Sequence, residues 1–148
     1  MQPHRRRRAE QGQTLVIMAL ALALLLVGLF YLVGNASTLL THNAKANAVA
    51  LRAAEVGAAQ IDYSDLYSGA PAHLDGTAAL VWCDETLALE GMAQPDLASG
   101  QPACRLVYGT PGPIGVIATA QQKVDLPFPL IGGRPTLTST TTVEAFAK

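Results

Sequence analysis

The chain has 148 residues, of which 50% are hydrophobic and 14% are charged, and its formal net charge at pH 7 is −1. A chain of this length leaves room for one small domain with a modest core, so we expect a single domain. The net charge hides an asymmetry: residues 1–12 carry +3 (four arginines and one glutamate), and residues 13–148 carry −4 (six basic and ten acidic side chains).

The N-terminal segment predicts a membrane helix with its orientation signal. Residues 14–33 (TLVIMALALALLLVGLFYLV) contain no charge, and Arg5, Arg6, Arg7 and Arg8 precede them closely. At about 1.5 Å per residue, twenty helical residues cover the roughly 30 Å hydrocarbon core of a bilayer. The arginines should stay in the cytoplasm, which places everything after Val33 outside. We interpret them as this signal and not as a nucleic-acid patch, so no nucleic-acid partner is expected.

The helical pattern continues beyond the apolar segment. Residues 37–61 are rich in alanine, lack proline, and place polar residues at spacings of three, four and seven. The remaining face is small and apolar, and it predicts close packing on another backbone, either this protein's own sheet or the helices of partners. This helix-packing seam consists of Ala46, Val49, Ala50, Ala53, Val56, Gly57 and Ile61.

Turn residues between Tyr63 and Pro71 predict the end of this helix, and β-rich runs follow. We expect strands over 77–83, 104–108, 114–124 and 135–146, and a short helix over 85–92. In the last strand, threonines alternate with apolar residues, which predicts a solvated threonine face.

Two cysteines, Cys83 and Cys104, lie in the part that should face an oxidising compartment. They lack the CxxC spacing of a metal site, so we expect a disulfide, with two buried free thiols as the alternative. Closing a loop of about 22 residues would contribute roughly 3 kcal/mol in the chain-entropy model.

The exterior part carries no recognisable catalytic pattern. His4, His42 and His73 lack metal-ligand spacing, and surface positions are expected for all three. Asp84 and Glu85 are neighbours whose side chains diverge on a helix or a strand, so they form no acid/base pair. The glycines of GTPGPIG and IGGRP lack the frame of a phosphate loop. We expect no enzyme activity, no cofactor and no metal.

The N-terminal pattern resembles the TadE/TadG-like proteins, which are pseudopilins and assembly proteins of bacterial tight-adherence (Flp-type) pili. The resemblance is carried by RAEQGQTLVI (residues 8–17) directly before the span and by NAKANAVA (43–50) in the alanine-rich helix. The C-terminal part also looks like short TadE-type members, with PFPL (127–130), a glycine turn at Gly132 and Gly133, and a final alternating strand.

The resemblance implies cleavage by a prepilin peptidase between Gly12 and Gln13, which would remove the arginines. Pilin-type proteins usually carry a glutamate at the fifth position after this glycine, and it is thought to pair with the α-amine of a neighbouring subunit. This chain has Ile17 there. Without that glutamate, the α-amine of a neighbouring subunit would be an unpaired charge among apolar helices, which is costly. We therefore do not expect the chain to polymerise into a pilus shaft.

We therefore expect an α+β protein with a long transmembrane, pilin-like helix followed by a small antiparallel β domain with one disulfide. Its expected divisions are a leader (1–12), a transmembrane helix (13–35), an amphipathic extension (36–66) and an exterior β-rich domain (67–148). The resemblance implies a TadE-like minor pseudopilin that packs its helix on other pilins, pseudopilins and pilus-assembly proteins in the inner membrane. The further partners that we expect are the lipid bilayer and, as the processing enzyme, the prepilin peptidase.

Two other interpretations remain open. The chain could be a permanently anchored exterior binding module whose leader is kept. It could also be secreted, because Gly34-Asn35-Ala36 loosely fits a signal-peptidase site. The first residue of the mature protein distinguishes the three interpretations. Gln13 would support the pseudopilin, an intact Met1 or Gln2 would support the anchored module, and Ser37 would support secretion.

Overall fold

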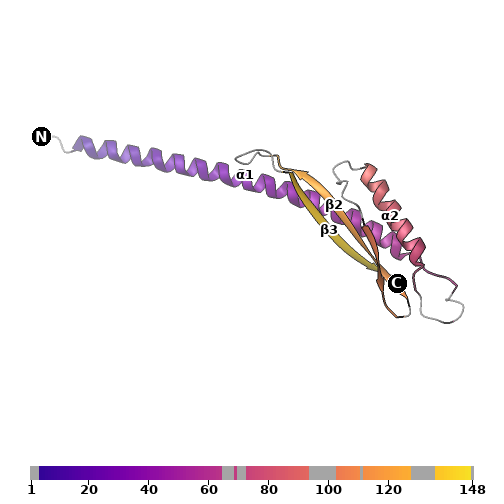
Figure 1. Ribbon diagram of the computed structural model, residues 1–148. Coiled ribbons are helices and arrows are strands. Elements are labelled where there is room, and N and C mark those ends of the chain that lie inside the picture. The colour runs from indigo at the N-terminus through magenta and orange to yellow at the C-terminus, as the bar shows by residue number, and fades with distance from the viewer. Residues whose placement is uncertain are drawn as a thin grey trace. The chain divides into compact units, whose positions relative to one another are not determined.

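The computed structural model describes residues 4–64, 69, 73–93, 103–110, 112–127 and 136–147, and its side chains from Gln13 onward except Met92 and Ala93. The fold is α+β, with one long apolar N-terminal helix, a second helix and a three-stranded antiparallel sheet (Figure 1). It divides into two compact units, Met1–Ser37 and Thr38–Lys148. We call the second unit the head.

Helix α1 covers His4–Ala58 and forms the described part of the first unit and the first element of the head. The sequence explains its length, because residues 4–58 contain no proline and are rich in leucine and alanine. It ends earlier than the Tyr63–Pro71 region we predicted. The reason is a competing pairing: Ile61 forms an antiparallel bridge with Leu74, and the Asp62 amide donates to the His73 carbonyl at 2.9 Å.

Helix α2 covers Gly76–Ala93 and corrects our prediction of a strand over 77–83. Asp75 is its N-cap, since its Oδ1 accepts the backbone N–H groups of Thr77 and Ala78, both at 3.1 Å. Ala79, Cys83 and Leu87 are buried at a spacing of four, which is the period of a helix. The helix predicted over 85–92 is therefore the second half of a longer one.

The strands are β1 (Ala103–Tyr108), β2 (Pro113–Asp125) and β3 (Thr136–Phe146), in the order β1-β2-β3. All three correspond to predicted strands. The register of β2 with β3 runs without a break from Gly115 opposite Phe146 to Asp125 opposite Thr136. The threonines at even positions of β3 are exposed, as predicted. Most of the predicted PFPL and glycine-turn segment, 128–135, lies outside the described residues.

The core of the head lies between the helices and one face of the sheet. On β2 the residues Val116, Ala118 and Ala120 are buried against the alanines of α1. Small side chains let these elements approach closely: a Cβ added to Gly57 would lie 2.9 Å from the Ala79 carbonyl oxygen and 3.2 Å from Val116 Cγ2. A glycine is therefore required where α1 meets α2 and β2.

Candidate functional site

The most prominent functional feature is the apolar surface of α1 in the first unit. Its large hydrophobic side chains are between 46% and 73% exposed. They are Leu15, Val16, Ile17, Met18, Leu20, Leu22, Leu24, Leu25, Leu26, Val27, Leu29, Phe30, Leu32 and Val33. Patches this large on proteins mark contact with a membrane or another protein. Within the described residues, α1 is the one helix long and apolar enough to cross a membrane, by length and composition.

The residues of the predicted leader and processing site lie on this same helix. The backbone of Arg5, Arg6, Arg7, Arg8 and Gly12 is helical, and their side chains lie outside the described residues. Gln13 is helical and exposed, and Ile17 is 61% exposed. A peptidase that binds extended backbone would therefore have to unwind this turn before it cleaves after Gly12.

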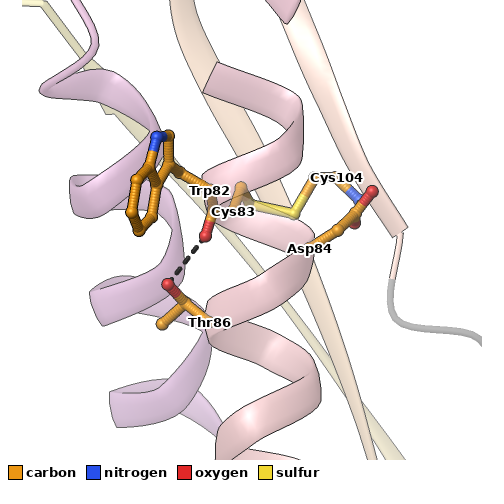
Figure 2. The surroundings of a disulfide bond; sticks show 5 residues. All are labelled: Trp82, Cys83, Asp84, Thr86 and Cys104. Atoms are coloured by element: carbon orange, nitrogen blue, oxygen red, sulfur yellow. Dashed lines mark hydrogen bonds between the residues drawn. A yellow bond between two sulfur atoms is a disulfide. The ribbon is translucent and has the colours of Figure 1, made fainter. Parts of the chain in front are cut away.

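The predicted disulfide between Cys83 and Cys104 is present, and it ties α2 to β1 with a Cα–Cα distance of 6.2 Å (Figure 2). Asp84, next to Cys83, accepts the backbone N–H of Cys104 on Oδ1 at 3.3 Å. On the same helix, the Thr86 hydroxyl donates to the Trp82 carbonyl at 2.7 Å. Helix α2 is thus joined to the outer edge of β1 by a covalent bond and a hydrogen bond.

The helix-packing seam is occupied by the chain's own head. Ala46, Val49, Ala50 and Ala53 are at most 6% exposed, Gly57 is buried, and Val56 and Ile61 are half-buried. The sequence left two occupants of this face open, the protein's own sheet or the helices of partners. The structure shows the sheet on this face, together with α2. The physical reason is that alanine and glycine side chains allow the sheet to approach the helix backbone. This face of α1 is therefore already covered within the head.

A polar cluster follows the seam toward the start of the head. Gln122 is only 1% exposed, and its Nε2 lies 2.9 Å from Nδ1 of His42. Asn43 Oδ1 accepts hydrogen bonds from the hydroxyls of Thr141 at 2.9 Å and Ser139 at 3.3 Å. His42 is therefore half-buried and bonded, which corrects our expectation of a surface position. The signal was available, because β2 alternates and Gln122 falls on its buried face.

Asp62, Ser64 and His73 lie together after α1, but they do not form a nucleophile arrangement. The Ser64 hydroxyl donates to Asp62 Oδ1 at 2.7 Å, and the Ser64 amide donates to the same oxygen at 2.9 Å. His73 Nε2 is 3.9 Å from Asp62 Oδ2. The pKa of Asp62 is lowered by the Ser64 hydroxyl, then by the Ser64 amide and by the charge of His73. Because the hydroxyl points to the carboxylate, the cluster shapes a turn and has no activated serine.

The described residues contain no group of three or more histidine, cysteine, aspartate or glutamate side chains that could hold a metal ion. His4 lies where side chains are not described, and His42 and His73 belong to the separate clusters given above. Comparisons of this chain with family models, with curated proteins and with solved structures found no match.

Proposed function

We propose that this chain is a non-enzymatic, single-pass membrane protein that acts as a TadE-like minor pseudopilin or assembly component of a Flp-type pilus or related secretion apparatus. The observation that carries the proposal is the exposed apolar surface over residues 15–33, which directly follows four arginines. In a bilayer, those side chains face lipid, and the arginines hold the N-terminus on the cytoplasmic side.

The head supports an exterior location. Its two cysteines form a disulfide, and such bonds persist in oxidising compartments outside the cytoplasm. The single covalent link joins α2 to β1, and it stabilises a domain whose core is built largely from alanine and valine. A protein anchored in the inner membrane with its head outside would place the apolar side chains of the first unit in lipid and the disulfide of the head in an oxidising compartment.

Helix packing in the membrane is the proposed mode of action. Lipid tails are as apolar as leucine, so association between helices depends on close packing and on polar contacts. The seam over residues 46–57 is filled by the head, which leaves the lipid-exposed segment for partner pilins and assembly proteins. Because Ile17 stands where a pairing glutamate is usual, the protein would initiate or organise the assembly and would not form its shaft.

Peptide mapping of the mature N-terminus tests this proposal in cells with and without the prepilin peptidase. We expect the protein to begin at Gln13 when the peptidase is present and to keep its arginines when it is absent. Gly12→Leu should block this cleavage because the added side chain obstructs the peptidase groove.

Gly28→Leu is the matched control, since it adds the same side chain to the same helix at a position with open space. It should be processed normally. A protein that begins at Met1 or Gln2 in both strains would favour the permanently anchored binding module. A soluble protein that begins at Ser37 would favour secretion.

A further inference from the structure

Strand β3 lies at one edge of the sheet, and its backbone polarity can be assigned. The Ala147 amide donates to the Ile114 carbonyl at 2.9 Å, and the register continues without a shift through Ala145 opposite Val116. In an antiparallel pair, alternate residues bond to the neighbouring strand. The odd-numbered residues of β3 therefore face β2, and the N–H and C=O groups of the even-numbered residues point to the free edge.

The two edges of the sheet differ in how they are protected. Strand β1 has 6 residues, a register shift between Val107 and Tyr108, and an amide at Cys104 that is capped by Asp84. Strand β3 has 11 residues with no proline, lysine or glycine, and its register has no shift. Proteins usually protect edge strands with bulges, charges, prolines or covers, because an open edge pairs with other strands. Within the described residues, β1 has a register shift and a capped amide, whereas β3 has neither and carries a single charged side chain, Glu144.

Space is available beside the free edge. A groove of about 560 Å³ lies between Leu40, Asn43 and Asn47 of α1 and residues 140–142 of β3. A second groove of about 630 Å³ lies between Leu51, Glu55 and Ala58 of α1 and residues 144–146 of β3. Helix α1 thus runs beside β3 in the same direction and leaves room along the edge.

We propose that the free edge of β3 binds an extended segment of another protein by strand addition. Outward N–H and C=O groups at alternate residues are complementary to a second extended backbone. The groove near Phe146 is lined by apolar side chains and by Glu55 and Glu144, and among the described residues no cationic side chain lines it. The segment therefore carries β-branched or aromatic residues and a lysine or arginine, whose stem covers the apolar wall while its charge meets the carboxylates.

The proposed occupant is a different protein and not a second copy of this chain. The β3 strand of a second copy carries Glu144 and no lysine or arginine, so it cannot supply a cation to a groove lined by Glu55 and Glu144. Pairing two β3 edges would only add carboxylates, and like charges across an interface oppose binding. The β1 edge of a second copy is also a poor partner, because Asp84 caps its Cys104 amide and its register shifts between Val107 and Tyr108.

In-cell photo-crosslinking of the full-length protein tests the inference. The probe is a benzophenone amino acid at Asn47, which is exposed on α1 and lines the groove. The same probe at Arg105, exposed on β1, is the control. We expect a crosslink from position 47 to a different polypeptide, with the crosslinked segment containing a basic residue next to β-branched or aromatic residues. Position 105 should not give this product.

Two test variants and one control variant show whether the crosslink depends on the edge. Thr142→Pro removes an outward N–H and no backbone hydrogen bond to β2, and the crosslink should fall by about tenfold or more. It also removes the 3.4 Å contact between the Thr142 and Thr119 hydroxyls, which Thr142→Val removes equally. Thr142→Val keeps the N–H and should leave the yield unchanged. Glu144→Lys reverses a groove charge without altering the backbone, so it should lower the yield severalfold even if the proline variant fails to fold.

Membrane association and N-terminal processing of these variants are measured in parallel, so failure of the anchor proposal is distinguishable from failure of this one. A crosslink only to another copy of the chain would overturn the inference. The absence of any crosslink from position 47 would also overturn it. So would a crosslink whose yield is reduced by neither Thr142→Pro nor Glu144→Lys.

Discussion

The two halves of α1 carry opposite kinds of apolar surface. In the first unit, leucine, valine, isoleucine and phenylalanine side chains are large and exposed, whereas in the head the inward-facing alanines at 46, 50 and 53 are small and fully buried. Large side chains supply apolar area to face lipid, and small ones allow a sheet to pack on the helix backbone. One continuous helix thus carries an exposed apolar surface in one unit and a buried one in the other, and the two differ in side-chain size.

The largest effect is expected from charges on the exposed half. Replacing both Leu24 and Leu25 with arginine should cost about 5 to 7 kcal/mol of apparent insertion free energy, because each arginine near the middle of a span costs about 2.5 to 3.5 kcal/mol. Membrane fractionation should show the protein leaving the membrane.

A control pair places the same charges on the same helix within the head. Leu40→Arg with Leu51→Arg changes residues that are 70% and 41% exposed. This variant should remain in the membrane fraction. Equal loss of membrane association in both pairs would contradict the proposed division of α1 into a lipid-facing part and a head-packing part.

A smaller effect is expected from adding volume to the buried half. Gly57→Leu would force a side chain against the Ala79 carbonyl and Val116, and we expect a loss of about 3 kcal/mol in the free energy of unfolding of the head. Denaturant titration in detergent, followed by fluorescence of the single tryptophan Trp82, measures this loss.

Gly28→Leu adds the same volume at an open position of the first unit. It should leave the unfolding midpoint of the head unchanged. If Gly57→Leu were equally silent, the close approach of α1 to α2 and β2 would be wrong.

The smallest effect is expected from the turn that follows α1. The folded-state pKa of Asp62 is lowered, so its stabilising contribution is present above the pKa of the unfolded state and is lost as the pH falls through the folded-state value. Asp62→Asn should therefore slightly reduce the steepness of acid destabilisation below about pH 4. The measurement is the unfolding midpoint of both proteins between pH 2 and pH 7, and a steeper acid limb in the variant would contradict the assignment.

The fold was predictable from sequence where the pattern was long and periodic. The apolar run over residues 14–33 and the alternation of threonines in β3 predict their elements directly. Helix α2 was missed because the run TAALVWC, with its threonine, valine and tryptophan, also suits a strand. The N-cap Asp75 favoured a helix, and it decides the element together with the spacing of Ala79, Cys83 and Leu87.

The site was less predictable because packing partners are not encoded locally. The seam of α1 was recognised, but its occupant depends on how the sheet folds back on the helix. The disulfide between Cys83 and Cys104 was predicted because both cysteines lie in the part expected to face an oxidising compartment and lack the spacing of a metal site, and the structure confirms it. The open edge of β3 follows only from the strand order, which alternation along a single strand does not reveal.

Protease accessibility in sealed cells stripped of their outer layers tests the central claim most directly. The account predicts that externally added protease degrades the head of the membrane-bound protein, while an N-terminal fragment that contains residues 14–33 stays protected in the membrane. A head that resists external protease until the membrane is opened, or a protein found in the soluble fraction with its arginines still attached, would contradict the account.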